Sequence, residues 1–300
     1  MADWQRGCVY TCLIGNYEKL NEQPISPQSS VPFICLTDDA GLQSSTWRIV
    51  RIEPLFPMDP VRSQRMLKLL PHRFLPDFEL SLYIDNSVIL KKKPEEIFDR
   101  YLASADFALP IHSFRDRVIE EFIEVAELAK DDPNRIFEQW DHYRASDPDA
   151  LAERPYWTGI LLRRHTSADA RRALEHWAAH VLRYSRRDQL SANAVFRLAR
   201  LQPLGLDIDN HESWFHTWPH ARGRALRPAN SPGVPLPDKI AAQDEQLARA
   251  KVQFMRDTEK IAAKPSWRSW RLTGLVRSLY RRWSRRTGSL KAAGRDRRRS

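Results

Sequence analysis

Residues 80–87 contain the feature that most constrains the fold, a short apolar strand pattern that ends in an acidic corner. Apolar residues alternate along 80–84, and Asp85, Asn86 and Ser87 follow directly. Alternation over this length predicts a β-strand rather than a helix. Open α/β sheets bind ligands at the carboxyl ends of their strands, where a carboxylate can hold a divalent cation and the cation a diphosphate. All three corner residues also favour turns, so this stretch alone leaves a plain turn as the alternative.

The surrounding sequence predicts an α/β sheet. Asp59 and Pro60 predict the start of a helix, because Asp is a good N-cap and Pro suits the first helical position, and Pro71 ends it. Strands that alternate with loops and helices are typical of this fold class. Further strands are predicted at residues 7–13, 31–36, 47–52, 106–112 and 157–165, and further helices at 114–130, 168–184 and 189–198.

Three segments, taken in order, resemble the DUF616 family of glycosyltransferase-like proteins. They are residues 10–18, 67–74 and 78–87, and the resemblance extends over about residues 7–220. It implies a GT-A-like, Rossmann-like mixed sheet flanked by helices, in which an Asp-x-Asp corner binds a nucleotide-sugar through a metal. Ser87 stands where the second carboxylate would be, so the metal needs a further ligand.

The resemblance also implies which residues bind the nucleotide-sugar. Thr11, Gly15 and Tyr17 are expected near the nucleotide, although Tyr17 would equally suit a half-buried aromatic position. Asp38 and Asp39 follow the second predicted strand. They are expected either to accept a base N–H or to cap the next turn.

Basic residues of the predicted helix at 59–70 are expected to offset phosphate charge. Arg62, Arg65 and Lys68 are spaced by three residues and share one helical face; a solvated face is the alternative. The remaining predicted contacts with the nucleotide-sugar are His72, Asn86, His112 and Arg115.

Asp188 and Gln189 resemble an Asp-Gln pair that faces the sugar in related transferases, and with Asp85 they form the predicted catalytic set. As an alternative, Asp188 would cap a helix that begins at Gln189.

A cluster of late histidines is a candidate source of the missing metal ligand. The resemblance implies that His216 or His220 joins Asp85 and Ser87 around Mn²⁺ or Mg²⁺. The spacing does not fit a zinc motif.

Charge and composition divide the chain into four parts. Residues 264–300 contain 13 Lys and Arg and one acid, whereas the rest contains 35 basic and 37 acidic residues. We therefore predict a domain at 1–226, a Pro-rich linker at 227–237, a charged helix at 238–263 and a basic amphipathic tail at 264–300.

The tail predicts the location of the protein. Its apolar residues recur at helical spacing among arginines, so we expect residues 264–290 to lie on an anionic membrane surface; packing of this apolar stripe on the domain, with a disordered end at 295–300, is the alternative. Cys8, Cys12 and Cys35 fall in predicted buried strands, which indicates reduced thiols and a cytoplasmic protein at the inner face of the membrane.

The leading functional hypothesis is a metal-assisted glycosyltransferase. It would move a sugar from a nucleotide-diphospho-sugar to a glycan or surface-polysaccharide acceptor. One alternative is a family member that binds the donor without turnover. Another is a nucleic-acid-binding protein acting through the tail, which the slightly acidic domain disfavours.

Overall fold

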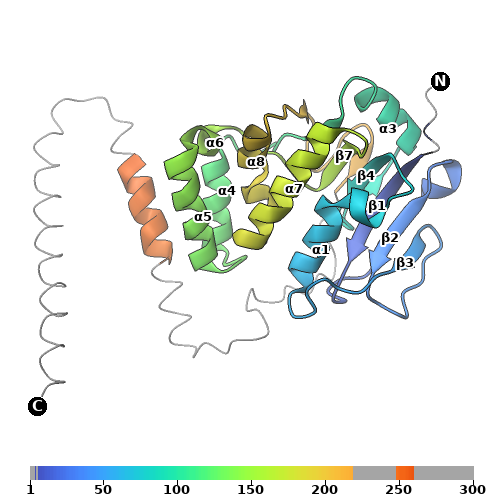
Figure 1. The fold of residues 1–300 in the computed structure, drawn as a ribbon, viewed down its shortest axis with the longest axis horizontal. Helices are drawn as coiled ribbons and strands as arrows, with labels where there is room; N and C mark the ends of the chain where they lie inside the picture. Colours follow the sequence, from blue (N-terminus) through green and yellow to red (C-terminus); the bar gives the residue numbers. More distant parts are fainter. Residues whose placement is uncertain (1–3, 5, 219–247, 260–300) are drawn as a thin grey trace, which may run out of the picture. The chain divides into compact units, whose positions relative to one another are not determined.

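The computed structural model describes residue 4, residues 6–218 and residues 248–259. Residues 6–218 contain a seven-stranded mixed sheet in the order β3-β2-β1-β4-β7-β6-β8, of which Figure 1 labels β3, β2, β1, β4 and β7. The strands are β1 (Gly7–Leu13), β2 (Phe33–Thr37), β3 (Arg48–Arg51), β4 (Leu80–Ile84), β6 (Phe107–Pro110), β7 (Ile160–Arg164) and β8 (Leu204–Leu206).

Strand direction brings six carboxyl ends to one edge of this sheet. β1 pairs in parallel with β2 and β4, β2 with β3, and β6 with β8, while β7 is antiparallel to both β4 and β6. The edge therefore holds the carboxyl ends of every strand except β7, which contributes its amino end. We call it the carboxyl edge, and the opposite one the amino edge.

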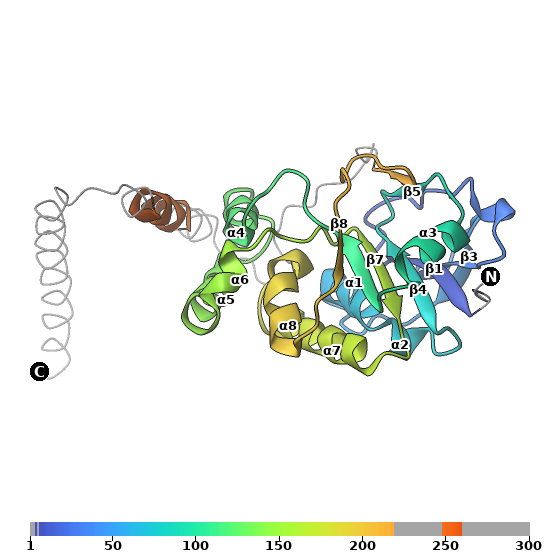
Figure 2. The same ribbon diagram turned by 90° about the horizontal axis from the view of Figure 1, so that it is seen from above.

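Helices cover both faces of the sheet (Figure 2). One buried cluster joins the sheet to α1 (Pro60–Leu69), α7 (Ala168–Arg183) and α8 (Ala192–Ala199). A second cluster, on the other face, includes α3 (Pro94–Tyr101) and a small sheet of β5 (Ile89–Leu90) and β9 (His216–Thr217). This arrangement confirms the predicted fold class, a mixed α/β sheet flanked by helices.

The remaining elements are short or lie beside the main layers. These elements are α2 (Pro71–Phe74), α4 (Val118–Glu127), α5 (Pro133–Ser146), α6 (Pro148–Ala152) and the 3₁₀ turns η1 (Ser26–Gln28) and η2 (Asp188–Leu190). α4, α5 and α6 pack on one another, and α6 also contacts α8 (Figure 1).

Local sequence signals set several element boundaries. Asp59 caps α1 by accepting the Arg62 N–H at 3.0 Å, as predicted, and α1 ends before Pro71. The helix predicted from residue 189 begins instead at Ala192. Asp188 therefore starts the turn η2 and is not the N-cap of a longer helix.

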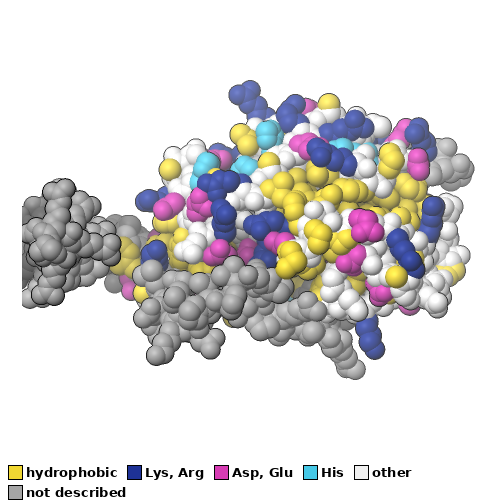
Figure 3. Space-filling view, turned by 60° about the horizontal axis from the view of Figure 1, so that its bottom comes forward, with side chains coloured by type: hydrophobic (Ala, Val, Ile, Leu, Met, Phe, Trp, Pro, Cys, Tyr) yellow, Lys and Arg dark blue, Asp and Glu magenta, His cyan; other side chains and the backbone are white. Residues whose placement is uncertain are grey.

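Surface side chains of different kinds separate on the face that Figure 3 turns forward. Hydrophobic side chains gather in its middle, and Lys and Arg side chains lie around them. In the loop before α1 and in its first turn, Leu55, Phe56, Met58 and Val61 are exposed.

The C-terminal part is described only in the segment 248–259. This segment is helical and falls inside the predicted charged helix at 238–263. The predicted linker at 227–237 and the basic tail lie outside the described residues. Within the described ranges, no helix combines the length and apolarity needed to cross a bilayer.

Candidate functional site

The carboxyl edge brings together residues that are far apart in the sequence. Gly15 follows β1, Asp38 follows β2, Asp85 follows β4 and His112 follows β6. The register of β4 and β7 pairs Ile84 with Ile160, so the segment before β7 lies against the Asp85 corner. This is the edge at which open α/β sheets bind their ligands.

Asp85 presents one carboxylate oxygen without a partner. Its side chain is 34% exposed, and its Oδ1 accepts a hydrogen bond from the Tyr83 hydroxyl at 2.7 Å and lies 3.7 Å from Lys68 Nζ. Oδ2 contacts no hydrogen-bond or ion-pair partner within the described part of the chain. Burial, and then the Asp85 charge, raise the pKa of Tyr83 well above its ordinary value, so this phenol remains a donor.

Two cations of α1 converge on Asp188. Lys68 Nζ lies 2.7 Å from Asp188 Oδ2, and Arg65 Nε lies 2.8 Å from Oδ1. The side chains of Lys68 and Asp188 are 1% and 4% exposed. Burial would raise the pKa of Asp188, but Arg65 and Lys68 outweigh it and hold that pKa well below its usual range. Asp188 is therefore an ionised carboxylate that fixes two cations beside the Asp85 corner.

The backbone of Lys68 is anchored from the sheet. Arg163, fully buried in β7, donates from Nη1 to the Lys68 carbonyl at 2.6 Å and from Nη2 to the Tyr10 hydroxyl at 2.6 Å. The Tyr10 hydroxyl in turn donates to the Lys68 carbonyl at 2.7 Å. The end of α1 is thus fixed to the middle of the sheet. The sequence signal for this anchor is an arginine that directly follows the apolar run of β7, with Arg164 after it at the end of the strand.

Arg187 is a cation that the sequence reasoning missed. Its guanidinium makes no hydrogen bond or ion pair with any residue in the described ranges, although the side chain is half-buried. Burial, and then the Arg65 charge, lower its pKa, while Asp188 and Glu121 act in the opposite direction. Gln189, next in η2, is also half-buried. An unpaired, partly desolvated cation beside another cation is the arrangement that an anionic ligand completes.

Gly15, Asp38 and Asp39 hold the loops of the carboxyl edge. The Gly15 N–H donates to both carboxylate oxygens of Asp38, at 3.0 and 3.1 Å. Gly15 has a φ of 80°, and an added Cβ would lie 2.7 Å from Pro60. Asp39 accepts the Gly41 N–H at 2.7 Å. Both carboxylates serve turns, which is the alternative that the sequence left open beside contact with a base.

Asn86 and Ser87 also connect loops at the corner. The Asn86 side chain accepts from the Asn21 N–H and donates to the Lys19 carbonyl, each at 2.8 Å. The Ser87 hydroxyl accepts from Trp218 Nε1 at 2.9 Å. Both residues are buried, so they shape the corner and present little surface to a ligand.

Tyr17 and Thr11 differ in their access to the site. Burial, then Glu18, raise the pKa of Tyr17, and the charges of Arg65 and Asp85 also act on it. The Tyr17 phenol therefore lies within electrostatic range of Arg65 and Asp85, and its contact with the nucleotide stays a prediction. Thr11 is fully buried inside β1, so the structure does not bring it to the edge.

Arg62 binds the end of a neighbouring helix. Its Nη2 donates to the Tyr184 carbonyl at 2.9 Å, its Nε donates to the Val181 carbonyl at 3.3 Å, and its Nη1 pairs with Asp59. These contacts connect α1 to the last turn of α7 and occupy the guanidinium, in contrast to the predicted phosphate role.

His72 lies at the amino edge, away from the Asp85 corner. It is in α2, before the amino end of β4, and its Nε2 contacts Glu175 Oε1 at 2.8 Å. The structure does not bring His72 to the Asp85 corner, because a residue that precedes a strand lies at the edge opposite to a residue that follows it.

His112 and Arg115 meet on the carboxyl edge after β6. Arg115 Nη1 lies 2.9 Å from His112 Nε2 and 2.7 Å from Glu121 Oε2. Burial, then Arg115, lower the pKa of His112 to about 4. The imidazole is therefore neutral at pH 7 and accepts a hydrogen bond from Arg115.

His216 is occupied by protein contacts and does not join Asp85. Its Nδ1 lies 2.6 Å from the Ser213 hydroxyl and its Nε2 lies 3.1 Å from the Asn210 carbonyl, which leaves neither nitrogen open. His220 lies outside the described residues. In the ranges that are described, no three His, Cys, Asp or Glu side chains are placed to hold a metal ion. The predicted set of Asp85, Ser87 and His216 is thus not assembled.

Sequence comparison identifies related proteins. Residues 8–209 match the family TOD1/MUCI70, glycosyltransferase-like domain. A probable hexosyltransferase MUCI70 of Arabidopsis thaliana is 30% identical over 166 residues, which cover 52% of this chain and 28% of that protein. The match thus spans less than a third of the relative's length.

Solved structures with a similar outline are also glycosyltransferases. Mouse xyloside xylosyltransferase 1 has a TM-score of 0.39 at 11% identity, covering 66% of this chain and 84% of its own. The galactosyltransferase LgtC, with donor and acceptor sugar analogues, has a TM-score of 0.37 at 15% identity, covering 62% and 69%. Core-mannan synthase A of Aspergillus fumigatus, in its Mn/GDP form, has 0.39 at 6% identity, covering 64% and 69%.

Proposed function

Because the chain belongs to the TOD1/MUCI70 family of glycosyltransferase-like domains, we propose that it transfers a sugar from a nucleotide-diphospho-sugar to a glycan acceptor. The reaction would take place at the carboxyl edge. The observation that carries the proposal is the charge arrangement there. Arg187 has no partner among the described residues and lies beside Arg65 and the Asp188-bound Lys68. Asp85 offers an open oxygen.

These groups match the charge that the reaction develops. When the bond from the sugar to the diphosphate breaks, negative charge accumulates on the departing diphosphate. Preorganised cations that face this charge lower the barrier most, because they need no reorganisation during the reaction. Arg187 would contact the diphosphate directly. Arg65 and Lys68, fixed by Asp188, would supply a positive field, so Asp188 acts as a positioning residue.

The Asp85 corner can hold a divalent cation only if the diphosphate of the nucleotide-sugar supplies further ligands. Mg²⁺ and Mn²⁺ are commonly held by one or two carboxylates, with phosphate oxygens and water completing the shell. Asp85 supplies one open oxygen, whereas Ser87 and His216 are engaged elsewhere. A metal held by Asp85 and the diphosphate would add positive charge at the leaving group.

A thermal-shift screen of nucleotide-sugars, with and without Mn²⁺, tests this proposal. A ligand that binds only the folded state at 100 times its Kd adds about 2.7 kcal/mol of stability. We expect one donor to raise the melting temperature, with a larger shift when Mn²⁺ is present. In Asp85→Asn the Mn²⁺-dependent part should disappear, whereas Asp77→Asn, an exposed carboxylate before β4, should keep it.

Two results would count against the proposal. If no nucleotide-sugar stabilises the protein, donor binding is refuted; if Asp85→Asn keeps the full Mn²⁺ effect, the role of Asp85 is refuted. A donor that binds without release of nucleoside diphosphate would favour the non-catalytic alternative.

We also propose that the basic tail at residues 264–290 places the enzyme on an anionic membrane surface at the cytoplasmic face. The support is sequence alone, because these residues lie outside the described ranges. Basic residues near an anionic leaflet contribute about 1 kcal/mol each. The full chain should sediment with anionic liposomes at low salt and a chain ending at residue 237 should not; failure of the full chain to bind would refute the proposal.

A further inference from the structure

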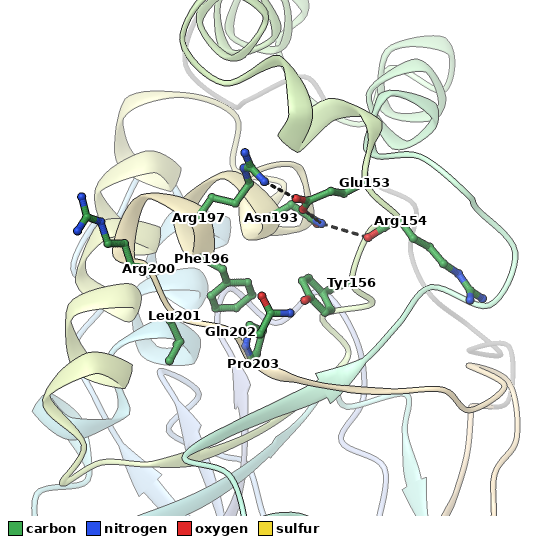
Figure 4. Close-up of a pocket in the computed structure, with 10 residues that line it drawn as sticks. All are labelled: Glu153, Arg154, Tyr156, Asn193, Phe196, Arg197, Arg200, Leu201, Gln202 and Pro203. Atoms are coloured by element: carbon green, nitrogen blue, oxygen red, sulfur yellow. Dashed lines mark hydrogen bonds and ion pairs between the residues drawn. The ribbon is translucent and has the colours of Figure 1, made fainter.

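A cavity of about 420 Å³ lies apart from the charged corner, between α8 and the segment that leads into β7 (Figure 4). Its size falls within the range of about 300–1,000 Å³ that is usual for ligand pockets. The lining residues are Glu153, Arg154, Tyr156, Asn193, Phe196, Arg197, Arg200, Leu201, Gln202 and Pro203.

Arg197, Glu153 and Arg154 are paired with other protein groups, whereas Arg200 is exposed and has no side-chain partner among the described residues. Arg197 Nη1 lies 2.7 Å from Glu153 Oε1, and the Arg197 guanidinium also contacts Asp147 at 2.7 Å. Arg154 donates to the His112 carbonyl, and Figure 4 shows the Arg154 and Arg200 side chains pointing away from the centre. The cavity therefore offers little free charge to a ligand.

The groups of the cavity that remain available to a ligand are a hydrogen-bond acceptor, a side-chain amide and aromatic rings. Asn193 donates from Nδ2 to Glu153 at 3.0 Å and to the Arg154 carbonyl at 3.1 Å, but its buried Oδ1 has no hydrogen-bond partner among the described residues. A buried acceptor without a donor is costly and indicates a ligand or water that completes it. Tyr156 and Phe196 pack edge to face with their ring centroids 5.5 Å apart, and the Gln202 amide also lines the cavity (Figure 4).

These groups suit a neutral sugar ring. A pyranose carries several O–H donors for an orphaned amide oxygen, further oxygens that accept from an amide N–H, and C–H faces that pack on aromatic rings. A charged ligand would lack an unpaired counterion in the centre, and a purely apolar ligand would leave Asn193 Oδ1 unsatisfied.

Both walls of the cavity continue into the charged corner. Tyr156 pairs with Ile111 in a single β-bridge, and Thr158, two residues later, begins the turn before β7, so their Cα atoms lie within about 7 Å of each other. Thr158 Oγ1 lies 3.3 Å from Lys68 Nζ. On the other wall, Asn193 lies in the first turn of α8, directly after η2 with Asp188. A chain of two or three sugar units would therefore reach from the cavity to the reacting centre.

We propose that this cavity binds a neutral sugar unit of the acceptor glycan, one or two units away from the hydroxyl that receives the new sugar. The inference rests on the proposed glycosyltransferase function. Asn193 and Gln202 would hydrogen-bond the sugar hydroxyls, and Tyr156 would pack against the ring. The cavity thus selects the acceptor, while the charged corner binds the donor.

Blocking the cavity tests this assignment. Gln202 is exposed at its mouth, so Gln202→Trp fills it without disturbing the core. Leu198→Trp is the matched control, because Leu198 is 57% exposed on α8 and does not line the cavity. The full-length variants are compared on immobilised neutral oligosaccharides of glucose, galactose, mannose and xylose, two to four units long.

We expect the unmodified protein and Leu198→Trp to bind the same oligosaccharides, and Gln202→Trp to bind them at least tenfold more weakly. Gln202→Ala, which removes the amide without filling space, should weaken binding severalfold and guards against misfolding of the Trp variant. Equal binding by all variants, no binding by the unmodified protein, or binding only to carboxylated oligosaccharides overturns the proposal. Donor-induced thermal shifts should be unchanged in Gln202→Trp, which separates failure of this assignment from failure of donor binding.

Discussion

The two edges of the central sheet both carry ionisable side chains, but they differ in whether the charged groups have ion-pair or hydrogen-bond partners. At the amino edge, His72 Nε2 contacts Glu175 while its Nδ1 has no hydrogen-bond partner among the described residues, and both ring nitrogens of His165 are hydrogen-bonded. At the carboxyl edge, Arg187 has no hydrogen-bond or ion-pair partner in the described ranges, and Asp85 has an open oxygen. Under the proposed function, this difference in pairing, rather than residue type, marks the groups that bind the donor.

This difference has a physical basis. When a buried charge is fully paired, the attraction of its partner offsets the cost of removing it from water. Such a pair can affect the stability of the fold but is not available to a ligand. A partly buried charge without a partner costs stability in the free protein, and a ligand that pairs with it recovers that cost. Substitutions at the two kinds of position should therefore separate effects on stability from effects on turnover.

The largest expected effect on the free energy of unfolding distinguishes two neighbouring arginines, Arg186 and Arg187. Arg186 lies 2.8 Å from the buried Asp131 and 3.3 Å from Asp59. Arg186→Met should lower the free energy of unfolding by about 3 kcal/mol, because Asp131 loses its ion pair. Arg187→Met should change it by less than about 1 kcal/mol, because no pair is lost. Urea unfolding of both variants checks this, and equal losses would remove the distinction between paired and unpaired arginines.

A smaller effect depends on pH at the amino edge. Burial, then the Arg163 charge, lower the pKa of His165 from 6.5 to about 3. As the pH falls from 6.5 towards 3, the imidazole is therefore protonated in the unfolded chain but remains neutral in the folded protein. The free energy of unfolding decreases over this pH range. Between pH 7 and pH 5 this amounts to about 2 kcal/mol at 1.36 kcal/mol per unit. His165→Gln should show a shallower fall in stability over this interval; an unchanged slope would contradict the assignment.

The smallest effect is expected at His72. The Glu175 partner is 39% exposed, and such pairs contribute about 0–1 kcal/mol. His72→Ala should lower the free energy of unfolding by no more than this and leave turnover unchanged. A large loss of turnover in the folded variant would place the donor at the amino edge and reverse the comparison.

Local signals in the sequence predicted most of the fold. The alternating run at 80–84 and the apolar runs before and after it are strands, and the Asp59-Pro60 start of α1 has the expected cap. Tertiary contacts decided the exceptions. α4 begins at Val118 rather than at residue 114. Arg115 stays in the turn before the helix, because its side chain is held by His112 and by Glu121 of α4.

The candidate site was predicted in part. Asp85, Lys68, Arg65 and Asp188 were all named from the sequence, and the structure brings them together. The sequence missed Arg187 because the absence of a partner is a property of three-dimensional packing. Helical spacing grouped Arg62 with Arg65, although only the packing of α7 shows that Arg62 binds helix carbonyls instead.

The most direct test of the account is the rate at which the protein releases nucleoside diphosphate from the donor that the thermal-shift screen identifies. The central claim is that an unpaired cation at the carboxyl edge stabilises the departing diphosphate. Arg187→Met should then lower kcat about 100- to 1,000-fold, as loss of one electrostatic stabiliser does in other enzymes, while the matched variant His72→Ala stays within about twofold of the unmodified protein. An Arg187→Met protein that folds and retains the original kcat would contradict the account.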